Sequence, residues 1–180
     1  NLALYYLERG RLADCEAALE KIRAIHPQAT NQLAPSYAEL RLLQHRPDEA
    51  LAAAALLDNE TDRTAIEAMA LFLRGETGSA LRKLKELSEQ SDAGSILRAT
   101  EVRHFMQLES DVEASLEALF EIARSNPAQR GEARSTADAL LRSPFIDWHE
   151  QPEYWSRLSL AKNLDRSWTA QPDQVPVGGE

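Results

Sequence analysis

Apolar residues recur along most of the chain at intervals of three and four positions, with polar residues between them. This spacing places apolar side chains on one face of an α-helix, and glycine, proline or short polar runs interrupt it at short intervals. The pattern therefore predicts short helices that come in pairs. The paired ranges are 1–9 with 12–26, 31–44 with 47–57, 62–74 with 78–89, and 94–108 with 111–124. Two further helices are expected at 130–143 and 152–165.

One motif repeats in the second helix of each pair: a small residue followed by apolar residues four and seven positions later. The small residues lie 35, 30 and 35 positions apart and are Cys15, Ala50, Ala80 and Ser115. A small side chain allows the two helices of a pair to cross closely. A fixed period predicts stacked units that share a continuous core and present a surface rather than an active site.

The same residues resemble the tetratricopeptide repeat family, whose units contain about 34 residues. Residues on the family's small, aromatic and turn positions include Ala3, Tyr6, Gly10, Ala38, Ala68 and Gly75, and the family's closing proline has counterparts in Pro27 and Pro127. Three residues depart from the pattern: Arg41 stands at an apolar position, His45 at a turn glycine and Arg103 at a small position. The resemblance covers roughly residues 1–127 and implies a right-handed superhelix whose concave side binds peptides or protein segments.

Together, the helix pattern and the resemblance predict an all-α fold, a right-handed α-solenoid of four to five helical hairpins with a C-terminal capping helix. The predicted domain spans residues 1–165 and is followed by a flexible tail at 166–180. An apolar end of a solenoid needs a cap, and the aromatic-rich C-terminal region supplies candidates. Tyr154, Trp155 and Leu158 are expected to form this cap, whereas Trp168 is a candidate for an external contact.

A second resemblance concerns the segment 143–155, which is similar to the closing segment of repeat domains in bacterial signalling proteins such as transcription regulators. It implies that the chain is the sensory or assembly part of a larger bacterial protein. The chain also opens on helix-like sequence without a methionine, so we expect it to be a piece of a longer protein.

Composition narrows the possible partners. The net charge of −9 argues against nucleic-acid binding by this segment, because phosphate groups repel such a surface. No apolar run reaches the roughly 18 residues that a membrane span requires, so membrane insertion is not expected. A single cysteine excludes an internal disulfide framework. The compartment stays open, with the cytoplasm slightly favoured over the periplasm.

No combination of residues indicates catalysis. His26, His45, His104 and His149 are not at the helical spacing of metal ligands, and Cys15 occupies a packing position. The run 75–79 lacks the lysine of a phosphate-binding loop and is explained by a turn between helices. We therefore expect a protein that is not an enzyme and has no cofactor, metal or catalytic residue.

The geometry of the family implies which residues line the concave groove and bind a protein or peptide partner. They are Leu4, Leu7, Glu39, Leu42, Leu43, Met69, Phe72, Leu73, His104 and Gln107. Most are apolar, which suits an amphipathic helix or an extended apolar segment, and the polar members would fix its register. The alternative is that the protein itself covers this surface.

Other possibilities remain open. Glu113, Glu117 and Glu121 line one face of a helix, either as a solvated face or as a contact for a basic partner. The domain could instead serve self-association, with its exposed apolar surface as a homodimer contact. A small-ligand sensor or an enzyme that uses the inside of the superhelix is a third alternative.

Overall fold

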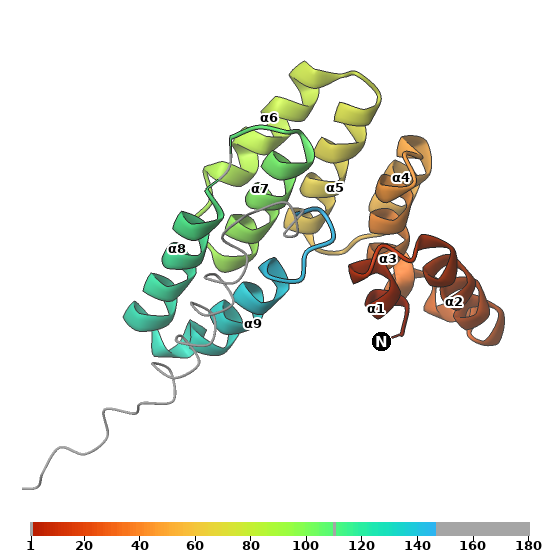
Figure 1. Cartoon of the computed structure of the whole chain (residues 1–180), viewed down its shortest axis with the longest axis horizontal. Helices are drawn as coiled ribbons and strands as arrows, with labels where there is room; N and C mark the ends of the chain where they lie inside the picture. Colours follow the sequence, from red (N-terminus) through yellow and green to blue (C-terminus); the bar gives the residue numbers. More distant parts are fainter. Residues whose placement is uncertain (1, 110, 147–180) are drawn as a thin grey trace, which may run out of the picture. The chain divides into compact units, whose positions relative to one another are not determined.

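The computed structural model describes residues 2–109 and 111–146, and these ranges contain α-helices and turns without a β-strand (Figure 1). The prediction of an all-α fold is confirmed. Asn1–Ile146 form one compact unit. The predicted helix at 152–165, its aromatic capping residues, Trp168 and the tail at 166–180 lie outside the described residues, so these remain predictions.

The helices follow one another with short connections. The first four are α1 (Leu2–Glu8), α2 (Leu12–Ile25), α3 (Thr30–Leu43) and α4 (Pro47–Ala54). The others are α5 (Glu60–Leu73), α6 (Thr77–Ser88), α7 (Ala93–Phe105), α8 (Val112–Ser125) and α9 (Arg130–Leu140). Single 3₁₀ turns, η1 (Pro27–Ala29) and η2 (Pro127–Gln129), precede α3 and α9. Each predicted pair within 1–124 thus corresponds to two consecutive helices.

Side-chain caps fix the starts of three helices. In each case an Asn or Asp side chain accepts a hydrogen bond from the backbone N–H three positions later, which satisfies a donor that the helix leaves unpaired. The pairs are Asn59 with Asp62 for α5, Asp92 with Ser95 for α7 and Asp111 with Ala114 for α8, at 2.9, 3.0 and 2.9 Å.

The same turn closes the first helix of each of the first four pairs. Its central residue has a positive φ and is Gly10, His45, Gly75 or Gln107, with φ values of 66, 55, 81 and 57°. The N–H of this residue donates to the carbonyl three positions earlier, and the next N–H donates to the carbonyl five positions earlier. These two bonds define the Schellman turn, which favours glycine because only glycine adopts positive φ without strain.

This turn aligns the four hairpins more reliably than the sequence motif does. The residue seven positions before the turn residue is small and buried in each hairpin, namely Ala3, Ala38, Ala68 and Thr100. In the fourth hairpin Thr100 therefore takes the small position that the sequence assigned to Arg103. The Oγ1 atom of Thr100 lies 2.8 Å from Oγ of Ser115 on α8, so the two small residues are hydrogen-bonded where the helices meet.

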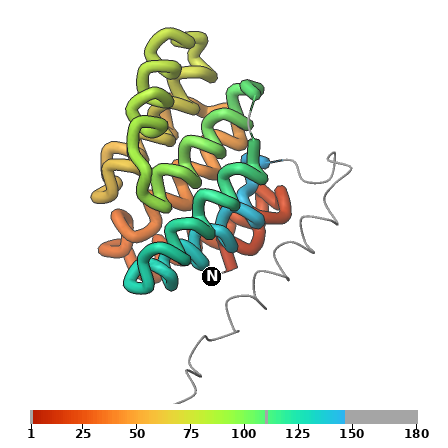
Figure 2. The backbone as a smooth tube through the Cα atoms, turned by 90° about the vertical axis from the view of Figure 1, so that its left-hand side faces the viewer, coloured from red at the N-terminus to blue at the C-terminus, as the bar shows by residue number. Residues whose placement is uncertain are grey.

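Each helix packs on the next one along the chain, and α1, α3, α5 and α7 also pack on the next helix but one (Figure 2). Thus α3 packs on α4 and α5, α5 packs on α6 and α7, and α7 packs on α8 and α9. The first helices of successive hairpins therefore contact one another directly. A buried cluster built mainly from alanines, leucines and methionines runs through α3 to α7 and includes Phe145, which follows α9.

Candidate functional site

The predicted groove residues divide into a buried group and a solvent-facing group. Leu7, Leu42 and Met69 have no solvent exposure and belong to the hydrophobic core. A partner could touch these three side chains only if the core opened. These three residues therefore do not form part of an accessible contact surface on the first helices.

The remaining apolar groove residues keep part of their surface in solvent. Leu4 on α1 is 39% exposed, whereas Leu43 on α3 and Phe72 and Leu73 on α5 are half-buried at the edge of the core. His104 on α7 is half-buried as well. Gln107 is exposed but lies in the turn after α7, so it is not on the helix face where the sequence placed it.

The chain covers part of this surface with one of its own side chains. The rings of Phe72 and Phe105 lie 6.5 Å apart and those of Phe105 and Phe145 lie 5.7 Å apart, both edge to face. This is a favourable geometry for aromatic pairs. Phe145 is only 8% exposed, so the segment after α9 covers the end of the predicted groove that α7 forms.

Two residues of this surface were missed by the sequence analysis. Glu101 lies six positions before the turn residue, like Glu39, and Phe105 lies two positions before it, like Leu43 and Leu73. The turn between α7 and α8 contains three more residues than the other three turns. If the turn before α8 is assumed to be as short as the others, the positions of α7 counted back from Ser115 are shifted by three residues. Glu101 and Phe105 then fall outside the predicted surface.

A buried ion cluster connects the first helices of the second, third and fourth hairpins. Arg98 on α7 contacts Glu39 on α3 at 3.2 Å, Asp62 on α5 at 2.7 Å and Glu101 on α7 at 2.7 Å. The side chains of Arg98, Glu39 and Glu101 are only 14, 13 and 4% exposed. We call these four residues the Arg98 cluster.

The charges of the Arg98 cluster do not balance, because three carboxylates surround one guanidinium. Burial, together with Glu101 and Asp62, raises the pKa of Glu39 to about 7, although Arg98 acts in the opposite direction. Burial opposes the charge of Arg98, but the three carboxylates outweigh it and raise the pKa of Arg98. The arginine therefore stays charged, and Glu39 is the member that can exchange a proton near neutral pH.

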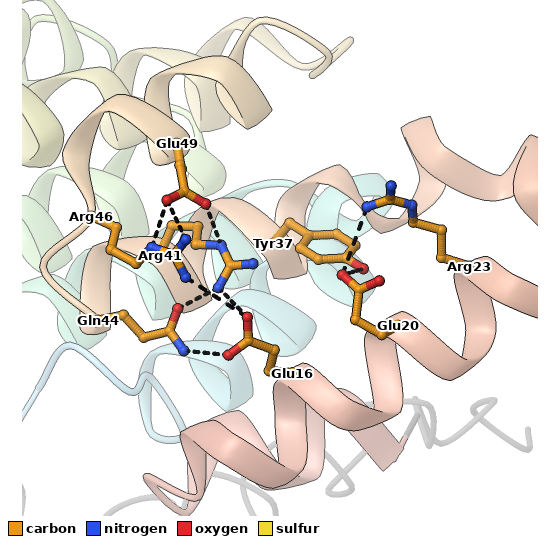
Figure 3. A network of polar contacts seen from close by, with 8 residues as sticks. All are labelled: Glu16, Glu20, Arg23, Tyr37, Arg41, Gln44, Arg46 and Glu49. Atoms are coloured by element: carbon orange, nitrogen blue, oxygen red, sulfur yellow. Dashed lines mark hydrogen bonds and ion pairs between the residues drawn. The ribbon is translucent and has the colours of Figure 1, made fainter.

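A second ion network holds the first two hairpins together (Figure 3). Arg41 on α3 donates to Glu16 on α2 at 2.6 Å and to Gln44 at 2.5 Å, and it pairs with Glu49 on α4 at 3.2 Å. Arg46 reaches the same two carboxylates. The hydrogen bonds from Arg41 and Gln44 lower the pKa of Glu16, despite some burial.

This second network explains why Arg41 stands at a position that is usually apolar. The Arg41 residue is 9% exposed, so its aliphatic part fills the core while its guanidinium reaches the network. In the same region, the Tyr37 hydroxyl donates to Glu20 at 2.9 Å. All of these groups are engaged with one another, which indicates a structural role.

A hollow of about 350 Å³ lies between α6, α7 and α8. Its polar lining includes Arg103, which donates to Ser88 Oγ at 3.2 Å, and the hydrogen-bonded pair of Thr100 and Ser115. None of these groups forms a nucleophile with a neighbouring base. These groups are already engaged in hydrogen bonds with one another.

Among residues 2–109 and 111–146, no group of three or more His, Cys, Asp and Glu side chains could hold a metal ion. In the same part of the chain, no helix is long and apolar enough to cross a membrane. Cys15 is fully buried, and burial, with Glu39 and Glu16, raises the pKa of its thiol. A buried thiol with a raised pKa is a poor nucleophile.

Compared with known protein families, curated proteins and solved structures, the chain matches none.

Proposed function

We propose that the chain is a non-catalytic scaffold that binds a protein or peptide, built as a right-handed solenoid of tetratricopeptide-like hairpins. The repeated Schellman turn, the buried small residue seven positions before it, and the contacts between successive first helices support stacked units. Such stacks offer an extended surface along their first helices. The similarity at 143–155 supports a place in the sensory or assembly part of a larger bacterial protein.

One observation carries this proposal: half-buried apolar side chains lie on successive first helices that contact one another. They are Leu43 on α3, Phe72 and Leu73 on α5, and Phe105 on α7. Each already packs against the core, so a partner would complete its burial at little cost in side-chain entropy. An amphipathic helix or an extended apolar segment has the chemistry to do so.

The test uses the two half-buried leucines. We expect Leu43→Asp and Leu73→Asp, singly and together, to remove binding of a peptide selected from a random library against the wild-type chain. Complete loss in the double variant corresponds to a decrease in affinity of at least about 100-fold, since each aspartate must be desolvated in an apolar contact. Isothermal titration calorimetry measures the affinity, and circular dichroism checks that the helices persist.

The matched control is Leu81→Asp on α6, because Leu81 is 43% exposed and lies outside the predicted groove. It should leave the peptide affinity unchanged. Equal loss of binding in the control and the groove variants, or binding that survives the double variant, would contradict the assignment of the groove.

A second candidate function is homo-oligomerisation. It is favoured by three apolar side chains on the seven-residue helix α1, Leu2, Leu4 and Tyr5, which are 60, 39 and 47% exposed. A second copy of the chain could cover them. Sedimentation equilibrium over a wide concentration range distinguishes the two functions, because a chain that stays monomeric at high concentration does not use this face for self-association.

A further inference from the structure

The networks around Arg41 and Arg98 differ in their charge balance. Around Arg41 the carboxylates of Glu16 and Glu49 meet two guanidinium groups, because Arg46 contacts both of them. Around Arg98 three carboxylates meet one guanidinium. The first network is neutral when fully ionised, whereas the Arg98 cluster then carries an excess of two negative charges.

Three other cations on α5, α6 and α7 are engaged with partners outside the Arg98 cluster. The nearest arginine along α5, Arg63, pairs with Glu60, and the next arginine along α7, Arg103, donates to Ser88. Lys83 on α6 pairs with Glu67 and Glu86. An uncompensated carboxylate is costly at 13% exposure, so binding a proton is the direct way to relieve it.

We propose that the Arg98 cluster is a proton-operated lock, in which Glu39 holds a proton while α3, α5 and α7 are tightly packed and releases it when their contact loosens. The lock joins three successive hairpins, because each of these helices contributes at least one member. In the closed state, with Glu39 protonated, the cluster has one excess negative charge. In the open state Glu39 is ionised, and solvent reaches the second excess negative charge.

Glu39 is the carboxylate farthest from Arg98, at 3.2 Å against 2.7 Å for Asp62 and Glu101, which makes it the member best placed to hold the proton. From α5 it faces Asp62, from α7 it faces Arg98 and Glu101, and from α2 it faces the Cys15 thiol, whose pKa Glu39 helps to raise. On α4, Asp48 and Glu49 turn to Arg74 and Arg41. On α1, Tyr5 and Tyr6 lie against Arg9 and Arg11. The turn η1 carries no titratable group, and Arg98 is the cation that lowers the pKa of Glu39.

The position of the lock links it to the apolar surface of the first helices. Glu39 lies one turn before Leu43 on α3, and Glu101 lies one turn before Phe105 on α7. Loosening the Arg98 cluster changes the spacing between helices that carry these side chains. The affinity of this surface for an apolar segment should therefore depend on pH in the neutral range, whatever the identity of the partner.

The direction of the stability change follows from the pKa of Glu39, which rises from 4.5 to about 7 in the folded chain. A carboxyl group with a raised pKa binds its proton more tightly in the folded chain than in the unfolded one. Its contribution to stability is complete below the unfolded pKa and disappears as the pH rises through the folded value. The lock should open between about pH 6 and pH 8.

Two measurements on the full chain test the lock. The first is a carboxyl ¹³C NMR titration of wild-type Glu39, for which we expect a midpoint near 7. A midpoint below about 5, the ordinary range of a glutamate, would overturn the proposal. This measurement needs no substitution, so it does not depend on whether a variant folds.

The second measurement compares the melting temperatures of the wild type and Glu39→Gln at pH 6 and pH 8. We expect the wild type to lose about 3–5 °C relative to the variant over this interval, because the neutral amide mimics the protonated carboxyl. Identical pH profiles of wild type and Glu39→Gln would overturn the lock.

The matched control is Glu16→Gln in the balanced Arg41 network. The pKa of Glu16 is lowered by its bonds to Arg41 and Gln44, so the stability that it contributes is constant near neutral pH and is lost only at acidic pH. This variant should melt lower than the wild type by the same amount at pH 6 and pH 8. If the melting temperature of Glu16→Gln changed between pH 6 and pH 8 by the same amount as that of Glu39→Gln, the effect would not be specific to the Arg98 cluster. That result would also overturn the proposal.

Discussion

His45 and Gln107 place side chains in a backbone conformation that favours glycine, with φ values of 55 and 57°. The backbone bonds of the turn explain why they persist there, since the N–H groups of both residues donate to carbonyls of the preceding helix. The conformational strain remains at each residue. The two hairpins with Gly10 and Gly75 avoid this strain, because glycine adopts a positive φ without it.

At the residue scale we predict that His45→Gly stabilises the fold by about 0.5–1 kcal/mol. The substitution relieves backbone strain in the folded chain, and the greater entropy of glycine in the unfolded chain offsets part of that gain. The converse change, Gly75→Ala, should destabilise it by about 1–2 kcal/mol. A Cβ at Gly75 would meet no atom within 4 Å, so steric clash does not contribute. Urea denaturation measures both, and unchanged midpoints in both variants would contradict the role of turn strain.

At the scale of the helices, the sequence predicted most of the elements but misplaced one register. Periodicity located each hairpin within 1–124, because the apolar spacing and the breaks at Gly10 and Gly75 are local signals. It failed between α7 and α8, since Gln107 and Leu108 carry no turn signal and the longer connection was invisible. Glu101 and Phe105 were lost from the predicted surface for that reason.

The ion networks were beyond sequence analysis for a different physical reason. The pairs of Arg98 with Asp62 and with Glu39 join residues 36 and 59 positions apart. Local spacing carries no information about such contacts. The departure of Arg41 from the repeat pattern was the one visible signal, and the structure explains it through three helices that meet at this side chain.

The corresponding prediction concerns the contact between α2, α3 and α4. Arg41→Met keeps the aliphatic packing but leaves Glu16 and Glu49 without their most buried cation, so we expect a loss of about 2–3 kcal/mol in unfolding free energy. Arg74→Met is the control, because Arg74 is 43% exposed and pairs with two surface carboxylates. It should cost less than about 1 kcal/mol. Equal losses of unfolding free energy, measured by urea denaturation, would mean that the burial of the Arg41 side chain does not matter.

For the unit as a whole, the central question is whether its apolar surface is open or covered by the chain itself. The surface is partly open at Leu43 and Leu73, which are half-buried, whereas Phe145 covers it at Phe105. The two conditions coexist because Phe145 reaches the surface from the segment after α9. We therefore expect this segment to compete with any partner that uses the surface near α7.

Phe145→Ala tests this competition. It should lower the unfolding free energy by about 3 kcal/mol, as expected for a buried phenylalanine, and should increase binding of an apolar probe or peptide by exposing Phe105. The control is Phe120→Ala on α8, because Phe120 is 7% exposed, close to the 8% of Phe145, and is not a member of the buried cluster that contains Phe145. Both variants should lose similar stability, but only Phe145→Ala should gain binding, and adding Leu73→Asp should remove that gain. If Phe120→Ala gains binding to the same extent, the increase reflects general loosening of the core, and the segment after α9 does not compete for the surface.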